Sequence, residues 1–437
     1  MKRLIFTMIV AASFSLYAQT ATEKSRVITV EDAVVLAADN NISLKRQKIT
    51  LDALDKRNKT SWNGVSPSAS LSGSYEIPFD GLLTEKEASN KYTYSFSASV
   101  SLSLTPSLYT SIKEARLKFE SGKTSYEDAV RQVELSVRKL FYSLLYTKES
   151  ISLQKRNMET ARLRYENNRD KYNRGQLSEL DLLQSQYSYE SQRPTIESAE
   201  IAYQNNMASF KQTLGISQDE KIELSGSLSD AIPPETFTVT QTVEELPSVK
   251  KIQTNIEQQK NSLLATRFSA YAPSISASYS WGMNRLSDKT EDITKANENE
   301  SHSLSFGVRI PLDGYLPWSN GALSIAAQKG ALKDLELQLE DEKTTASLNL
   351  ENSIKNILQK QSQMEMLNRN VEIAQKSYDM TLTAYNHGSR DLLTLQNASD
   401  SLLKAKTDRE SHIYNLICAV LDLENTLGVP FGSLGNE

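Results

Sequence analysis

The stretch YTYSFSASVSLSL, residues 92–104, decides the fold class of this 437-residue chain. Every even-numbered residue in it is apolar, counting tyrosine, and every odd-numbered residue is Thr or Ser. Because successive side chains of a β-strand point to opposite faces, this alternation predicts a strand with one apolar and one hydroxyl-bearing face. We therefore expect two strand pairs, at about residues 67–105 and 273–312. The alternation also occurs at residues 69–77, 275–283 and 304–310.

The polar face of these predicted strands carries mostly Ser, whereas a soluble sheet would more often carry Lys, Glu or Arg. Tyr and Trp in the apolar rows are typical of strands in membrane β-barrels, and a soluble sandwich is the alternative. Four strands cannot close a barrel, and open sheet edges do not occur in lipid. The chain is therefore expected to assemble with copies of itself. Two copies would give eight strands and three would give twelve, and the pattern does not choose.

The two strand pairs belong to an internal repeat. Three short motifs recur at a constant distance of 213 residues: Thr29-Val30-Glu31 with Thr242-Val243-Glu244, Tyr172-Asn173-Arg174-Gly175 with Tyr385-Asn386-His387-Gly388, and Leu214-Gly215-Ile216 with Leu427-Gly428-Val429. The repeat predicts two equivalent halves, residues 19–216 and 242–429. Residues 217–241, which contain Pro233-Pro234, are expected to form an equatorial linker, and residues 430–437 a C-terminal tail.

The remainder of each half is predicted to be long helix, with one helix before the strands and two after them. Apolar residues from Tyr126 to Ile151 follow steps of three, four or seven, which indicates a coiled-coil seam. A helix of roughly 65 residues would reach about 100 Å. Glycine after such a helix, followed by a polar residue, predicts a C-cap and a new N-cap. We therefore expect tight turns at residues 173–178 and 386–391, at the same end of the molecule and far from the strands.

The rest of the sequence excludes several classes of function. Residues 1–18, with Lys2 and Arg3 before an apolar run, are expected to be a signal peptide. The net charge of −5 argues against nucleic acid as a partner. The three histidines are scattered, and no catalytic or phosphate-binding motif occurs, so neither an enzyme nor a metal or cofactor site is expected. The single Cys418 lies near the C-terminus, which leaves no cysteine for an N-terminal lipid anchor.

The turn motif Tyr172-x-x-Gly175-x-x-Ser178-x-x-Asp181-Leu182-Leu183-x-Ser185-Gln186, and its echo Tyr385-x-x-Gly388-x-x-Asp391, resemble the TolC-like outer-membrane efflux family. The resemblance covers roughly residues 29–430. It implies a mixed α and β membrane protein, a homotrimer with a twelve-stranded barrel in outer-membrane lipid and a helical tunnel crossing the periplasm. Such a channel serves tripartite efflux or type I secretion together with a periplasmic adaptor (membrane fusion) protein and an inner-membrane transporter of the RND, ABC or MFS type.

The resemblance also assigns roles to residues of the two turns. Asp181 matches the acidic latch of the periplasmic gate, and Tyr385 and Arg390 match its partners. The positions of two constriction acids hold Thr394 and Asn397, so an acidic ring is in doubt, although Asp391 lies one turn earlier. The adaptor-docking positions are Gly175, Gln176, Leu177, Ser178, Gly388 and Ser389.

Simpler roles are also possible for these residues: a helix N-terminal acid, a seam tyrosine and a solvated arginine. A structural or adhesive coiled-coil stalk is the rival function, because long helices alone would fit it. It would predict neither membrane-grade strands nor duplicated glycine turns. Within the channel interpretation, the sequence leaves both the substrate and the class of partner pump open.

Overall fold

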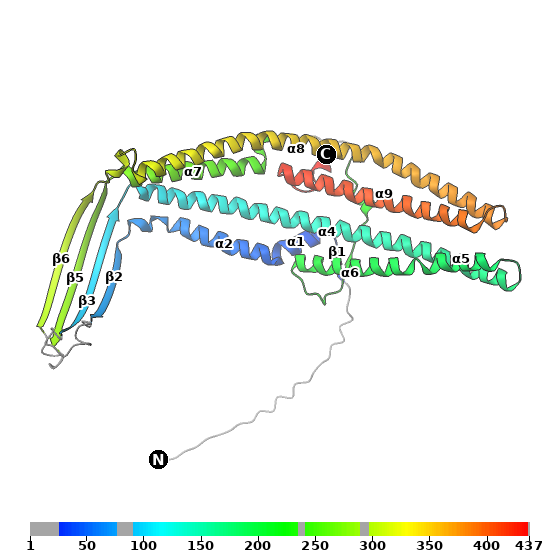
Figure 1. Ribbon diagram of the computed structural model, residues 1–437, viewed down its shortest axis with the longest axis horizontal. Helices are drawn as coiled ribbons and strands as arrows, with labels where there is room; N and C mark the ends of the chain where they lie inside the picture. Colours follow the sequence, from blue (N-terminus) through cyan, green and yellow to red (C-terminus); the bar gives the residue numbers. More distant parts are fainter. Residues whose placement is uncertain (1–25, 77–90, 235–240, 289–296, 436–437) are drawn as a thin grey trace, which may run out of the picture.

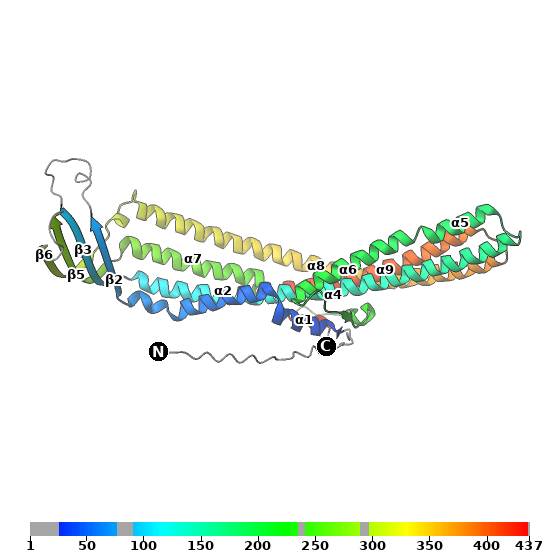
Figure 2. The same ribbon diagram turned by 90° about the horizontal axis from the view of Figure 1, so that it is seen from below.

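The computed structural model of the protein describes residues 26–76, 91–234, 241–288 and 297–435. The expected signal peptide at residues 1–18 lies outside the described residues. The molecule is strongly elongated, with a sheet at one end and two helical turns at the other (Figures 1 and 2). The sheet and the turns are thus separated by the full length of the helices.

The larger sheet contains four antiparallel strands in the order β2-β3-β5-β6, which confirms the two predicted strand pairs. They are β2 (Ser68–Glu76), β3 (Lys91–Leu104), β5 (Ser274–Asp288) and β6 (Asn297–Arg309). The register aligns the hydroxyl-bearing residues across all four strands. One row contains Ser70, Ser99, Ser280 and Ser303. Because β2 and β6 end the order, each has one edge unpaired by any described strand.

Two helices of equal length run the length of the helical body. α4 (Ser107–Asn173) and α8 (Asn320–Asn386) each have 67 residues, and their bounds differ by the repeat distance at both ends. At 1.5 Å per residue each is about 100 Å long. Figure 1 shows both helices passing from the sheet to the turns. The long helices and the internal repeat predicted from the sequence are thus confirmed.

The shorter helices differ between the halves. In the first half, α1 (Val30–Asn40) and α2 (Ile42–Lys59) stand where a single helix was expected. Asn41 separates them, since its Oδ1 accepts the backbone N–H groups of Ser43 (2.9 Å) and Leu44 (3.2 Å) and so caps α2. The second half has one helix here, α7 (Pro247–Tyr271).

A second difference lies beyond the turns. α5 (Glu179–Glu190) and α6 (Arg193–Leu214) are two helices, whereas α9 (Leu392–Leu427) is continuous. Pro194 is the second residue of α6, and the matching residue of α9 is Thr407. Because proline cannot donate a backbone hydrogen bond, the first half breaks where the second half continues.

The best-packed region is the middle of the molecule. A short parallel pair, β1 (Arg26–Ile28) and β4 (Ile222–Leu224), lies here, and β4 falls within the segment expected to be a linker. The buried cluster draws on both halves and includes Val137, Phe141, Phe210 and Ile413. Short 3-10 helices complete the fold: η1 (Ser61–Val65), η2 (Leu228–Ala231), η3 (Val243–Glu245), η5 (Asp313–Tyr315) and η6 (Ser433–Gly435).

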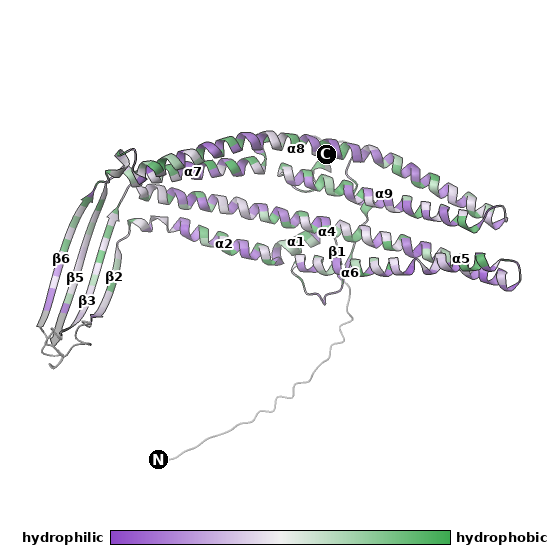
Figure 3. Ribbon diagram, viewed as in Figure 1, coloured by the Kyte–Doolittle hydropathy of each residue, from purple (hydrophilic) through white to green (hydrophobic). Residues whose placement is uncertain are grey.

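Hydrophilic and hydrophobic residues alternate along the helices rather than gathering in one of them (Figure 3). Among the described residues, no helix combines the length and the apolar character needed to cross a membrane.

Candidate gate and docking turns at the helical end

The two turns that join the helix pairs have the same hydrogen-bonding pattern. In the first, the N–H of Gly175 donates to Tyr172 O (2.8 Å) and the N–H of Gln176 donates to Lys171 O (2.9 Å). The second turn repeats both bonds at Gly388 and Ser389. This is the Schellman arrangement, in which a left-handed residue ends the helix. The glycine motif of the sequence therefore ends α4 and α8 in the same way.

Gly175 and Gly388 both have φ of +72°, a conformation that side-chain-bearing residues rarely adopt. A Cβ added at either glycine would meet no described atom within 4 Å. Glycine is therefore required by the backbone angle and not by crowding. Of the six expected docking residues, Leu177 is half-buried and the others are exposed: Gly175, Gln176, Ser178, Gly388 and Ser389. The structure thus places all six at the tips of the turns.

The helices after the turns begin with reciprocal caps. The hydroxyl of Ser178 accepts the N–H of Asp181 (3.2 Å) and donates to its Oδ2 (2.6 Å). At the matching position of the second turn, Asp391 accepts the N–H of Thr394 (2.9 Å) and its hydroxyl. These hydrogen bonds from Thr394, and to a lesser extent the charge of Arg390, hold the pKa of Asp391 below its ordinary value. The acid and the hydroxyl have thus exchanged places between the turns.

The three expected gate residues lie at this end but are not joined within one protomer. Asp181 is half-buried and Arg390 is exposed. The Tyr385 hydroxyl donates to Oδ1 of Asn168 on α4 (3.1 Å), and Lys171 Nζ lies 5.9 Å from the centroid of the Tyr385 ring. Within the described part of the chain, no hydrogen bond or ion pair links Asp181 to Tyr385 or Arg390. Any link among the three needs another conformation or a neighbouring copy.

The expected constriction residues lie on the first turns of α9. Thr394 is half-buried and bonded to Asp391, and Asn397 is exposed. Residues three apart on a helix share a face, so Thr394 and Asn397 belong to one stripe. That stripe has a hydroxyl and an amide where an acidic ring would need carboxylates.

Two buried or half-buried asparagines on α4 were missed by sequence reasoning. Asn168 is 1% exposed, and its Nδ2 has no hydrogen-bond partner among the described residues. Asn157 accepts the Ser399 hydroxyl (2.9 Å) and donates to Gln192 Oε1 (3.1 Å). They are eleven residues apart, a spacing that returns to the same helix face. A polar residue repeated on an apolar seam is the signal that could have found them.

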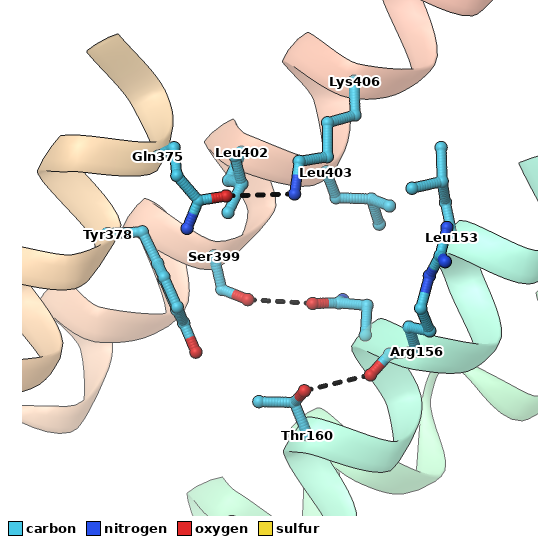
Figure 4. Close-up of a pocket in the computed structure, with 10 residues that line it drawn as sticks. Leu153, Arg156, Thr160, Gln375, Tyr378, Ser399, Leu402, Leu403 and Lys406 are labelled. Carbon is cyan, nitrogen blue, oxygen red and sulfur yellow. Dashed lines mark hydrogen bonds between the residues drawn. The ribbon is translucent and has the colours of Figure 1, made fainter. Parts of the chain in front are cut away.

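A cavity of about 210 Å³ lies between α4, α8 and α9 beside Asn157 (Figure 4). Its polar groups link the helices: Lys406 Nζ donates to Gln375 Oε1 (3.0 Å), and Ser399 donates to Asn157. Within the described residues, no group of three His, Cys, Asp or Glu side chains could hold a metal ion. Burial raises the pKa of the Cys418 thiol, which opposes nucleophilic chemistry. We assign this cavity a structural role.

Comparison with known proteins gives a consistent result. The model of the family "Outer membrane efflux protein" matches residues 33–216 and 239–429. The fold is similar to that of CusC (15% identity, 98% of this chain and 99% of that chain, TM-score 0.74). It also resembles the Campylobacter jejuni outer membrane channel CmeC (16% identity, 91% of this chain and 85% of that chain, TM-score 0.72). A third similar structure is the Neisseria gonorrhoeae outer membrane channel MtrE in its open state (16% identity, 92% of this chain and 89% of that chain, TM-score 0.69).

A comparison with curated proteins gave no match. The family match covers most of both halves. The matched residues include the four-stranded sheet, the paired long helices and the two glycine turns. This protein therefore belongs to the outer membrane efflux protein family and resides in the outer membrane, with its helices extending into the periplasm.

Proposed function

We propose that this protein is the channel-tunnel of a tripartite efflux or type I secretion system and acts as a homotrimer. The observation that carries the proposal is the four-stranded sheet, which has one apolar face, one hydroxyl face and two unpaired edges in the described chain. A sheet of this kind is stable in lipid only when its edges are closed. The alternative, a coiled-coil stalk, offers no reason for such a sheet.

The two faces of the sheet suit lipid and a water-filled lumen. Leu71 is 80% exposed, Phe306 78% and Val308 69%, and exposed apolar side chains in one sheet face favour contact with lipid. On the other face, hydroxyl pairs cross the strands, at 2.8 Å between Ser70 and Ser99 and at 2.6 Å between Ser72 and Ser97. A lumen lined by small uncharged hydroxyls would pass solutes with little selection by charge.

Aromatic residues with a polar group gather at membrane interfaces, and they occur here at two levels. About halfway along β5, Trp281 Nε1 donates to Glu300 Oε1 (2.6 Å), and the Tyr279 hydroxyl bonds to His302 Nδ1 (2.9 Å). Near the helices, Trp318 is 77% exposed. We place the hydrocarbon core of the membrane between these two levels.

The free edges suggest how copies join. β6 of one copy would pair with β2 of the next, a head-to-tail contact that closes a ring when the rotation fits. Four strands from each of three copies would make the twelve strands of a closed barrel.

The helical layer has matching edges. α8 forms one edge along its whole length, and α2 with α5 and α6 forms the other (Figure 1). Both edges expose large apolar side chains that a second copy would cover, and fully burying one contributes about 1.5–3 kcal/mol. They are Leu337, Leu348, Ile373 and Met380 on α8, and Ile42, Ile49, Tyr187 and Ile201 on the other edge.

We propose that the gate closes when Asp181 accepts the Tyr385 hydroxyl and pairs with Arg390. The exposed Arg390 guanidinium, without a hydrogen bond or ion pair in the described protomer, supports this role. A hydrogen bond contributes about 1 kcal/mol and an exposed ion pair about 0–1 kcal/mol. Repeated in three copies, such links suffice to bias a two-state element.

Below the gate, Thr394 and Asn397 would give an uncharged constriction, with Asp391 supplying a ring of charge one turn away. The exposed tips at Gly175 to Ser178 and at Gly388 and Ser389 would receive the hairpins of a periplasmic adaptor. The adaptor would connect the channel to an inner-membrane transporter of the RND, ABC or MFS type. Small-molecule efflux and protein secretion would use the same tunnel.

Two measurements test the proposal. Native mass spectrometry of the detergent-solubilised protein should give a trimer, and a stable monomer in mild detergent would overturn the assembly. In planar bilayers, Tyr385→Phe with Arg390→Ser should raise single-channel conductance above that of the wild type without an adaptor. A stalk would form trimers that do not conduct. A conducting trimer whose conductance the double variant leaves unchanged would refute the gate assignment alone.

A further inference from the structure

Asn168 provides the only hydrogen bond that the Tyr385 hydroxyl makes within the described chain. Asn168 lies on α4, one turn before the helix ends, and is 1% exposed. Tyr385 lies on the last turn of α8, and the bond between the two side chains is 3.1 Å long. It therefore ties the tip of one helix pair to the tip of the other.

A tyrosine hydroxyl has a single proton to donate. While it donates to Asn168, Tyr385 cannot also donate to Asp181. In the same structure the Asp181 carboxylate accepts the Ser178 hydroxyl (2.6 Å) instead. The bond to Asn168 and the proposed closing bond to Asp181 therefore exclude each other.

We propose that Asn168 is the positioning residue that holds Tyr385 in the open gate. The hydroxyl moves from Asp181 in the closed state to Asn168 in the open state. This inference rests on the proposed gate. An asparagine amide that lacks a partner for its Nδ2 is unfavourable inside a helical seam, where leucine would pack without that loss. Its presence favours a specific hydrogen-bonding role over packing.

Removing the two ends of this bond should have different effects. Tyr385→Phe loses the Tyr385 hydrogen bond of both states, so its effects on the open and the closed state largely cancel. Asn168→Leu loses only the open-state bond, so it should shift the equilibrium about five-fold per protomer towards closure, as expected for one hydrogen bond. A residue that merely packs would not act through Tyr385.

The test is a coupling experiment in planar bilayers. Arg390→Ser, which weakens the latch but keeps the tyrosine, provides a background with a measurable open fraction. There Asn168→Leu should lower the open fraction, and Asn168→Asp, which keeps an acceptor of the same shape, should not. In the Arg390→Ser, Tyr385→Phe background, Asn168→Leu should have no effect.

Asn157→Leu is the matched control, because Asn157 shares the helix face but bonds to Ser399 and Gln192. Its effect should be equal in both backgrounds. Equal effects of Asn168→Leu with and without the Tyr385 hydroxyl would overturn the inference, as would a loss of open fraction in Asn168→Asp matching that in Asn168→Leu. If the Arg390→Ser, Tyr385→Phe double variant conducts no better than wild type, the gate itself is wrong. Native mass measurements confirm that each variant compared is a trimer.

Discussion

Substitutions at the two glycine turns can test the docking proposal separately from the backbone strain that any side chain would cause there. At a φ of +72°, replacing Gly175 or Gly388 by an L-residue such as alanine or tryptophan costs roughly 1–2 kcal/mol of local strain. Alanine and tryptophan carry the same backbone cost. Because no described atom lies within 4 Å of the added Cβ, neither substitution creates a clash inside the protomer. Only the bulk that an approaching partner meets differs between them.

We expect Gly175→Trp and Gly388→Trp to abolish transport and the two alanine variants to retain most of it. A loss of about 1.4 kcal/mol of docking free energy already lowers adaptor affinity about tenfold. Transport is measured as cellular efflux of a pump substrate in a strain that depends on this channel. The amount of trimer in outer-membrane fractions is measured in parallel, and it should be unchanged for all four variants.

Gly432→Trp is the control for bulk. Gly432 also has a positive φ (82°) and open space around its Cβ position, but it lies in the C-terminal segment and not at the turns. It should leave transport intact. Undiminished transport by both tryptophan variants at the turns would remove the docking proposal. If the alanine variants lose as much transport as the tryptophan variants, the loss is caused by backbone strain and not by bulk.

Two further predictions concern the membrane level and the middle of the molecule. In single-tryptophan variants, lipids brominated near the headgroup should quench the fluorescence of Trp281 and Trp318 more than lipids brominated near the end of the acyl chain. Stronger quenching of either tryptophan by bromine near the chain end would contradict the proposed position of the hydrocarbon core. Burial raises the pKa of Glu424, whose Oε1 accepts the Leu434 N–H (3.1 Å), so its contribution to stability is greatest below its ordinary pKa and falls as the pH rises through the raised value. Glu424→Gln should therefore gain thermal stability relative to wild type as the pH rises from below the ordinary glutamate pKa, and a pH-independent difference in Tm would refute this.

The sequence predicts those features that depend on local pattern. The alternation of residues 92–104 places Ser and apolar residues on opposite faces because a strand has a two-residue period, and the structure has this arrangement in β3. The repeat distance of 213 residues separates the first residues of α4 and α8, and also their last residues, so the two helices have equal lengths. The turns at Gly175 and Gly388 follow from the requirement for a left-handed C-cap.

Contacts that depend on helix rotation were not predictable in this way. Asn168 and Tyr385 are 217 residues apart, and they meet only because α4 and α8 are long and in register at their tips. A small rotation of either helix would bring another side chain to the seam. The breaks at Asn41 and before Pro194 have local signals, a capping asparagine and a proline, but a repeat that predicts two equivalent halves does not predict a break in one half alone.

The two turns show how a repeat can keep one fold while changing its charge. Ser178 with Asp181 and Asp391 with Thr394 each satisfy the start of a helix, and such a cap contributes about 1 kcal/mol in either order. The exchange therefore has little effect on stability. It moves the carboxylate by three residues, about 4.5 Å along the helix axis. In α9 the acid Asp391 is itself the N-cap. It accepts hydrogen bonds from Thr394, which lower its pKa, so its carboxylate is needed at the helix terminus. In α5 the hydroxyl of Ser178 is the N-cap, so the Asp181 carboxylate can change its hydrogen-bond partners while the cap stays intact.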